Sequence, residues 1–468
     1  MKSQTLPTLK ALLLLLCTLC GTELIAQTIP QKLASAFEAF AKDPQLRNGI
    51  ASLYVVDAKT GEVVFGKNEL LGLVPASTQK VITSASAYEL LGRDFRYKTR
   101  FAYRREGASA ALLVLPGGDP TLGSWRWPST KEAAVLAGLA RATAKLGIKA
   151  FGTVRLDNSG WQTEAIPDGW IWQDIGNYYG AGAAKLNWRE NQFDVTLKSG
   201  SSIGDPVAIT AVVPPVSGYR LTSALTSAAA GSGDKAYIYF PIQSATGTIR
   251  GTIPVNQSRY TISGAMPDPS GQFVSAWQEA LAGSGVQLPR KITEEGDLAA
   301  EAGKYTVFHT ITSPPLDSIV YFFNRESINL YGEALLKTMA HAQAGAGATA
   351  KGAELVREFW KQRGIPDTEL CLMDGSGLSP LNRVTAHAQV SVLQHARKQP
   401  WFEGFYTSLP VYNGMRMKSG TLQGVKGYCG YHRGKDGREY AFSFLVNNYN
   451  GPSGTLVRKM YGVLDVLK

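Results

Sequence analysis

The sequence is poor in cysteine and has no long apolar run beyond its first residues. It contains 4 cysteines among 468 residues, and two of them lie in the short apolar stretch 11–20. A membrane-spanning helix needs about 20 apolar residues, and no stretch of the chain approaches that length. We therefore expect neither a disulfide-rich scaffold nor a transmembrane protein.

The sequence also lacks the patterns of metal and nucleic-acid sites. Its 5 histidines follow no ligand spacing such as H-E-x-x-H, so we expect no metal and no cofactor. The net charge of +11 is not gathered into a Lys/Arg-rich block, which argues against nucleic acid as a partner. A dispersed positive charge suits contact with an anionic envelope polymer.

The first residues have the pattern of a secretory leader. Lys2 and Lys10 precede the apolar stretch, and Ala26 follows it at a suitable cleavage position. We predict that residues 1–26 are a signal peptide and that the mature protein is exported. In an oxidising compartment Cys371 and Cys429 could form a disulfide, but their spacing fits two buried small side chains equally well.

The mature chain divides into three parts by its pattern of apolar residues. Residues 27–97 contain a strand-like hairpin followed by a helix, and residues 304–468 alternate helical and strand-like segments. Between them, residues 98–303 carry short β-type runs separated by Gly, Pro and Ser, with a nested unit at about 161–254. We predict one sandwich built from the two outer parts and interrupted by a β-rich insertion.

The segment Ser77-Thr-Gln-Lys80 is the first candidate for chemistry. A serine hydroxyl needs a neighbouring base to become a nucleophile, and residues three apart on a helix lie on one face. The unpaired N–H groups at a helix start favour a developing oxyanion, and burial would lower the pKa of Lys80 towards that of a useful base. Alone, the pattern is more typical of a helix-capping serine beside a solvated lysine.

Two later motifs change that balance. Ser327-Ile-Asn329 stands just before a predicted helix and offers a hydroxyl and an amide. Lys418-Ser419-Gly420-Thr421 lies on a predicted strand, where the charge and hydroxyls can bind a carboxylate and Gly420 permits close approach of the backbone. By contrast, the G-x-S-x-G match around Ser202 has no helix after it and no apparent His or Asp partner.

These motifs, in this order, resemble the low-molecular-mass class C penicillin-binding proteins, the D-alanyl-D-alanine carboxypeptidase and endopeptidase type. Ser327 follows Ser77 by 250 positions, which is similar to the large insertion of that family. Residues 117–122, Gly-Gly-Asp-Pro-Thr-Leu, and the Asp-Gly-Ser-Gly-Leu-Ser segment 374–379, with Asn382 after it, resemble further elements of the family.

The resemblance implies an α+β fold, a sandwich of an antiparallel sheet with helices on both faces, like penicillin-binding proteins and β-lactamases. It also implies site roles. Ser77 would attack the penultimate D-Ala carbonyl, Lys80 would accept its proton, and Ser327 would pass a proton to the leaving D-alanine. Asn329 would hold the substrate carbonyl, the backbone N–H groups of Ser77 and Thr421 would hold the oxyanion, and the substrate carboxylate would contact Lys418, Ser419 and Thr421.

The sequence departs from the family pattern in the pocket for the substrate side chain. Pro380 stands where some relatives have an arginine, and Arg383 is the candidate replacement. Asp119 and Gln423 match family positions that line this pocket, where an acidic group could pair with a substrate amine. Ile328 and Ser419 also differ from the usual residues but leave the required side chains in place.

The expected activity is hydrolysis of peptidoglycan stem peptides in the periplasm, with β-lactam antibiotics as covalent inhibitors. Two alternatives stay open at this point: a β-lactamase, and a wall-binding or sensor module without hydrolysis. The sequence leaves the balance of carboxypeptidase and endopeptidase action and the oligomeric state undetermined.

Overall fold

The computed structural model describes residues 27–107, 109–216, 218–289, 292–295 and 298–468. The predicted signal peptide, residues 1–26, lies outside them. Across the described residues, no helix combines the length and apolar character needed to cross a membrane.

A six-stranded antiparallel sheet forms the centre of the sandwich. Its strand order is β16-β17-β18-β19-β1-β2, so the pairing of β1 with β19 joins the start of the chain to its end. Strand β19 is buried along almost its whole length, because helices cover both faces of the sheet. The strands are β1 (Ile50–Asp57), β2 (Val63–Lys67), β16 (Val411–Tyr412), β17 (Met415–Leu422), β18 (Val425–Arg433) and β19 (Glu439–Asn447).

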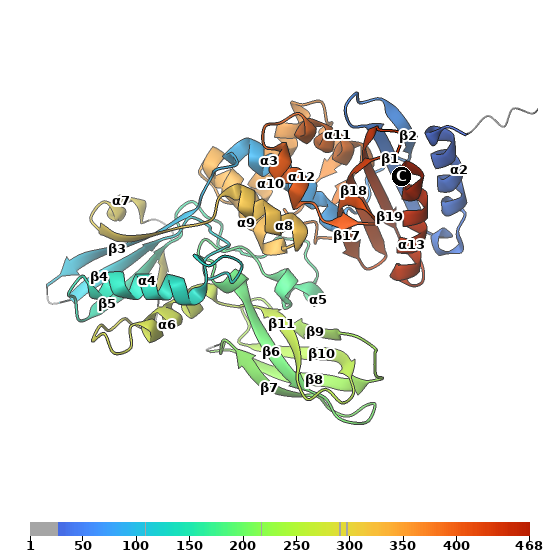
Figure 1. Ribbon diagram of the computed structural model, residues 1–468. Helices are drawn as coiled ribbons and strands as arrows, with labels where there is room; N and C mark the ends of the chain where they lie inside the picture. Colours follow the sequence, from blue (N-terminus) through green and yellow to red (C-terminus); the bar gives the residue numbers. More distant parts are fainter. Residues whose placement is uncertain (1–26, 108, 217, 290–291, 296–297) are drawn as a thin grey trace, which may run out of the picture.

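Helices lie on both sides of this sheet (Figure 1). On one face, α2 (Ile29–Ala41) and α13 (Ser453–Leu464) enclose a core that includes Phe37, Phe444 and Met460. On the other face, a second core includes Ile82 and Phe323. The helices around that second core are α3 (Lys80–Leu91), α8 (Leu316–Arg325), α9 (Asn329–Ala344), α10 (Thr349–Lys361), α11 (Ala386–Arg397) and α12 (Phe402–Ser408). The predicted α+β sandwich is confirmed.

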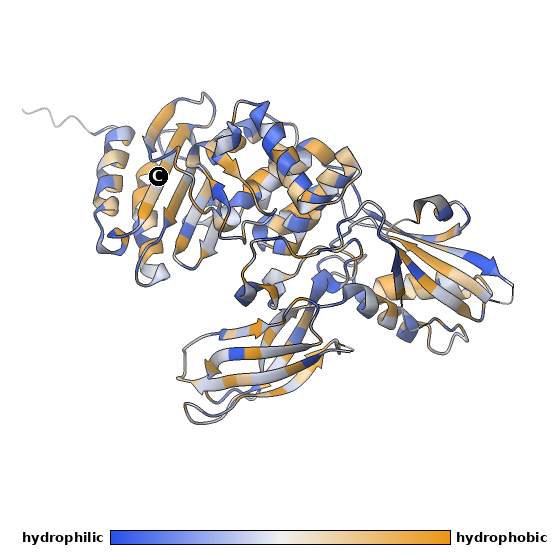
Figure 2. Cartoon of the chain, turned by 180° about the vertical axis from the view of Figure 1, so that it is seen from behind, coloured by the Kyte–Doolittle hydropathy of each residue, from blue (hydrophilic) through white to orange (hydrophobic). Residues whose placement is uncertain are grey.

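The distribution of apolar residues agrees with this layering. In Figure 2 the strands of the six-stranded sheet are largely hydrophobic, whereas α2 has both hydrophobic and hydrophilic residues, as expected for a helix with one buried face. Cys429 is a buried free thiol on β18, and Cys371 is free and exposed. Cys429 therefore fits the expected small buried side chain, whereas Cys371 does not, and the structure has no disulfide between them.

The chain leaves the sandwich after α3 and forms a separate five-stranded sheet with order β12-β5-β4-β3-β13. Its core includes Phe101 and Trp277. Strand β13 returns to pair with β3, so this sheet extends to residue 312, past the predicted boundary at 303. The elements are β3 (Lys98–Glu106), β4 (Ser109–Leu115), α4 (Glu132–Ala144), β5 (Phe151–Asp157), α6 (Pro269–Ala280), β12 (Ile292–Glu295), α7 (Ala299–Ala302) and β13 (Thr306–Thr312).

Two three-stranded sheets form the remaining part of the inserted region (Figure 1). They share a core that includes Val195, Ile238 and Ile249, and they run to residue 265 rather than the predicted 254. The segment before them carries the short helix α5 (Trp172–Ile175). The strands are β6 (Gln192–Lys198), β7 (Ala208–Val213), β8 (Arg220–Ala228), β9 (Lys235–Tyr239), β10 (Thr246–Pro254) and β11 (Tyr260–Ala265).

The remaining described elements are short. They are the two-residue strands β14 (Leu370–Cys371) and β15 (Arg383–Val384), which pair with each other, and 3₁₀ turns at Pro44–Leu46, Ala76–Gln79, Tyr178–Gly180, Arg189–Asn191, Asp367–Glu369 and Asp465–Leu467.

Candidate active site

Ser77 lies in a 3₁₀ turn, Ala76–Gln79, that leads directly into α3. The expected continuous helix is therefore a tighter turn followed by an α-helix. Ala76 has a φ of 46°, in the left-handed region that costs energy for residues with a Cβ atom. Such strain is commonly held at functional turns, and here it presents the Ser77 hydroxyl to a cleft.

Lys80 is fully buried directly behind Ser77. Its Nζ atom lies 2.9 Å from Ser77 Oγ, 2.7 Å from Asn329 Oδ1 and 2.8 Å from the carbonyl oxygen of Ser376. Burial lowers the pKa of Lys80 to about 7, because desolvation disfavours the ammonium form. Near neutral pH a large fraction of this side chain is a free amine that can accept the proton of Ser77.

Two buried acids oppose this lowering of the Lys80 pKa, Asp374 more strongly than Glu333. The Asp374 carboxylate accepts hydrogen bonds from the backbone N–H groups of Gly377 and Ser379, at 2.7 and 2.6 Å. Burial raises the pKa of Glu333 to about 8. Glu333 belongs to none of the sequence motifs, although it lies four residues after Asn329 and therefore on the same face of α9.

Ser327 and Asn329 come to the cleft at the start of α9. Ser327 has a left-handed φ of 59°, and Asn329 is the first residue of the helix. The Asn329 side chain donates from Nδ2 to the carbonyl oxygen of Tyr179, 2.8 Å away, in the inserted region. That contact fixes the amide orientation, so that Oδ1 faces Lys80.

Strand β17 lies against the turn that holds Ser77. A Cβ atom on Gly420 would lie 2.5 Å from the carbonyl oxygen of Pro75 and 3.1 Å from the nitrogen of Ser77, so only glycine permits this contact. Lys418 is buried and donates to the carbonyl oxygen of Ser419 at 2.9 Å. Burial, reinforced by repulsion from Lys80 and Lys426, holds the pKa of Lys418 well below its usual range.

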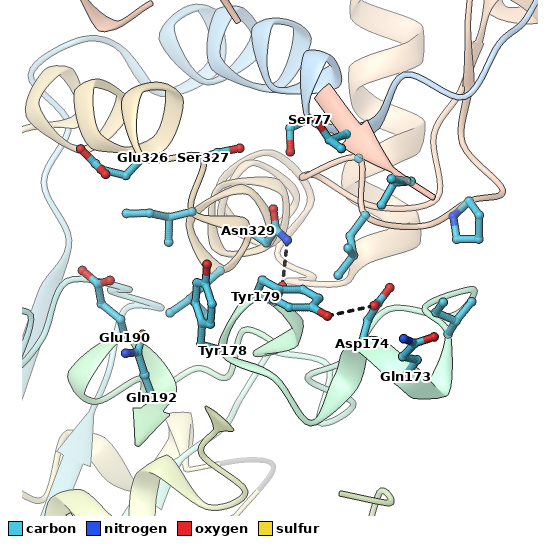
Figure 3. A pocket seen from close by; sticks show the side chains of 18 of the residues that line it. Ser77, Gln173, Asp174, Tyr178, Tyr179, Glu190, Gln192, Glu326, Ser327 and Asn329 are labelled. Carbon is cyan, nitrogen blue, oxygen red and sulfur yellow. Dashed lines mark hydrogen bonds between the residues drawn. The ribbon is translucent and has the colours of Figure 1, made fainter. Parts of the chain in front are cut away.

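A cleft of about 620 Å³ joins these elements. Ser77, Ser327 and Asn329 line its catalytic-domain side, and Tyr178, Tyr179 and Asp174 face them from the inserted region (Figure 3). Thr421 and Gln423 also line it. Lys80 and Lys418 lie buried next to it, and Ser419 and Gly420 belong to the strand that borders it.

Two predicted pocket residues do not reach the cleft. Asp119 is buried elsewhere, and its carboxylate accepts hydrogen bonds from the backbone and hydroxyl of Thr121 at 2.8 and 2.7 Å. The guanidinium of Arg383 is exposed and donates to the carbonyl oxygens of Pro380 and Asn382. Neither residue is among those that line this cleft, and their contacts with a substrate side chain stay a prediction.

Other charged residues occupy the cleft instead. Asp174, on α5, lines it and accepts a hydrogen bond from the Tyr179 hydroxyl at 3.3 Å. Burial raises the pKa of Asp174. Arg126 and Glu190 also line the cleft and form an ion pair at 2.8 Å. Asp174 lies two residues after the exposed Trp172 in the segment Trp-Gln-Asp-Ile, and no motif marks it in the sequence.

The acids that line the cleft include Asp174, Glu190 and Glu326. Within the described ranges, no group of three or more His, Cys, Asp or Glu side chains is arranged to hold a metal ion.

The whole chain apart from its ends matches a single protein family. A family model described as the D-Ala-D-Ala carboxypeptidase 3 (S13) family covers residues 33–464. The chain belongs to this family. As a member of the S13 family, the protein is a serine-type D-Ala-D-Ala carboxypeptidase, which is what the three motifs predict.

Individual proteins and solved structures are also similar to this chain over most of its length. A D-alanyl-D-alanine carboxypeptidase from Actinomadura sp. (strain R39) is 29% identical over 92% of this chain and 84% of its own length. The carboxypeptidase DacB of Haemophilus influenzae is 23% identical over 83% of each chain. The crystal structure of penicillin-binding protein 4 from Haemophilus influenzae superposes with a TM-score of 0.76 at 20% identity, covering 93% of this chain and 99% of that one.

The low pKa of Lys80 predicts a pH dependence for acylation of this S13 enzyme. Lys80 must be unprotonated to accept a proton, so kcat/KM should rise with pH and level off above about 7. Below that value it should fall about ten-fold per pH unit. A pH profile of acylation by a chromogenic β-lactam measures this, with Lys80→Arg as the inactive control. A flat or falling profile between pH 5 and 9 would contradict a basic role for Lys80.

The close approach of β17 to Ser77 predicts the effect of enlarging Gly420. Gly420→Ala should lower the acylation rate by about 100-fold or more, because the strand must move away from the turn and misplace the reacting groups. The matched control is Gly462→Ala in α13, where an added Cβ meets nothing within 4 Å. Equal rates for the two variants, measured with the same β-lactam, would show that the contact is not required.

Proposed function

We propose that this enzyme removes the terminal D-alanine from peptidoglycan stem peptides through an acyl-enzyme on Ser77. The observation that carries the proposal is the 2.9 Å contact between Ser77 Oγ and the buried Lys80 amine, at the wall of a cleft shared with Asn329 and Thr421. A serine paired with an amine of depressed pKa is the arrangement that nucleophilic acyl transfer needs.

Acylation proceeds by attack of Ser77 Oγ on the carbonyl carbon of the penultimate D-alanine. Lys80 takes the hydroxyl proton, and the backbone N–H groups of Ser77 and Thr421 stabilise the oxyanion. When the peptide bond breaks, Ser327 passes its proton to the leaving amine and receives in exchange the proton that Lys80 took from Ser77. D-alanine departs with its carboxylate held by Lys418, Ser419 and Thr421.

Water then hydrolyses the ester, which releases the shortened peptide and regenerates Ser77. A β-lactam would acylate Ser77 in the same way and remain attached, because its leaving group stays tethered to the acyl chain. A β-lactam complex is known for the similar penicillin-binding protein 4 of Haemophilus influenzae, which superposes with a TM-score of 0.72.

The cellular compartment of the reaction follows from the location of its substrate. Peptidoglycan lies outside the cytoplasmic membrane, and the lysines and short apolar stretch of residues 1–26 form a leader for export. We therefore assign the mature enzyme to the periplasm, after cleavage near Ala26.

Asp174 is the residue we assign to recognition of the substrate side chain. It is a partly buried acid in the wall of the cleft, and among the described residues it forms no ion pair with a basic side chain. A stem peptide that carries a free amine on its third residue would supply that partner and form a charge-assisted hydrogen bond.

Labelling with a fluorescent penicillin tests the nucleophile. Ser77→Ala should abolish both covalent labelling and release of D-alanine from a pentapeptide, because no other serine has a buried amine at bonding distance in the site. The control is Ser202→Ala, in the G-x-S-x-G segment, which should retain both. Labelling that survives in Ser77→Ala would refute the assignment.

The same experiment separates the alternatives. Rapid turnover of penicillin without D-alanine release would indicate a β-lactamase. Reversible binding without labelling or release would indicate a wall-binding or sensor module.

The role of Asp174 predicts a change in substrate preference. Asp174→Asn should lower kcat/KM for a peptide with a free side-chain amine by about ten-fold, the effect of losing one charged hydrogen bond. It should leave the N-acetylated peptide unaffected. Asp119→Asn, the acid outside the cleft, serves as the control. An equal effect of Asp174→Asn on both peptides would exclude recognition of the amine.

A further inference from the structure

Lys426 is a cation that the proposed mechanism does not use. It lies on β18 directly opposite Thr421 of β17 in the antiparallel register. Its Nζ atom lies 2.7 Å from Thr421 Oγ1, and Thr421 lines the catalytic cleft. The side chain of Lys426 therefore brings a positive charge to the end of β17 at which the leaving group is bound.

The surroundings of Lys426 leave this charge without an acidic partner. Burial lowers the pKa of Lys426, and no carboxylate among the described residues counteracts that effect. The Nζ atom lies 5.3 Å from the centre of the Tyr428 ring, whose face attracts a cation only modestly. A partly buried ammonium with no counter-ion is a favourable partner for an incoming anion.

Lys418 lies on the neighbouring strand β17, three residues before Thr421, and it likewise forms no ion pair in the described part of the chain. Repulsion from Lys426 contributes to the lowered pKa of Lys418, so the two ammonium groups act on each other across Ser419, Gly420 and Thr421. A carboxylate bound at this segment would be attracted by both charges and would reduce their mutual repulsion.

The polarity of the hydrogen bond to Thr421 supports the same conclusion. An ammonium group can only donate, so Thr421 Oγ1 accepts from Lys426. The hydroxyl hydrogen of Thr421 is then free to donate to a group in the cleft. Lys426 thus orients the hydroxyl as a donor, which a carboxylate oxygen needs, while adding charge nearby.

We infer that Lys426 is a specificity-determining residue that selects leaving groups carrying a free carboxylate. This inference rests on the proposed function, because the carboxylate belongs to the D-alanine that departs. The carboxylate would contact Thr421 directly and lie within the field of Lys426. An alternative role, in which Lys426 only supports the β17–β18 pairing, would not distinguish charged from uncharged leaving groups.

The test uses two D-alanyl thioester substrates that differ only in the leaving group, one with a free carboxylate and one with its methyl ester. Lys426→Met keeps the apolar stem and removes the charge. It should lower kcat/KM for the carboxylate substrate about ten-fold or more, as expected for loss of a charged contact, and leave the methyl ester within about two-fold of the wild-type value. Lys426→Arg should retain most of the preference.

Lys435→Met is the matched control, since Lys435 is an exposed lysine in the turn after β18, and it should change neither rate. Lys426→Gln provides a second neutral variant if Lys426→Met folds poorly. Equal losses on the two substrates, or no loss on either, would overturn the inference while the wild-type enzyme still forms its acyl-enzyme. Failure of the wild-type protein to form an acyl-enzyme with either thioester, followed by mass spectrometry, would instead overturn the proposed function and the inference with it.

Discussion

The catalytic domain is organised around the hydrogen bonds of the buried Lys80 amine. A polar group without water needs hydrogen-bond partners, and Lys80 finds them in segments far apart in the chain. Asn329 lies 249 positions away and Ser376 lies 296 positions away. Helices α3 and α9 and the loop after β14 must therefore converge on one atom, and the cleft forms where they meet.

The same burial sets the chemistry of the site. Desolvation of Lys80 favours the free amine, whereas Asp374 and Glu333 favour the ammonium, and the balance leaves the pKa near 7. The Asp-Gly-Ser-Gly-Leu-Ser segment contributes twice to this balance. Its first residue supplies the opposing charge, and its backbone supplies the carbonyl of Ser376. Residues 374–379 line little of the cleft, yet they help to set the pKa of Lys80.

What could be predicted from the sequence was mostly local. The spacing of Ser77 and Lys80 depends on a single helical turn, and the pattern of Lys418 to Thr421 depends on a single strand, so both follow from short-range rules. The positions of Asp119 and Asp174 could not be predicted from such short-range rules. Both are acids of the inserted region, and only the packing of that region decides which of them reaches the cleft. Asp119 instead satisfies Thr121 within its own loop.

The hydrogen bond from Asn329 to the carbonyl of Tyr179 joins the inserted region to the catalytic centre. This bond makes the insertion a structural part of the enzyme, not a separable accessory. A shortened chain trimmed to the sandwich alone would keep every catalytic side chain, yet the amide of Asn329 would lose its anchor and could rotate away from Lys80. Reduction of this architecture to a compact, β-lactamase-sized domain would therefore require a new acceptor for that one amide.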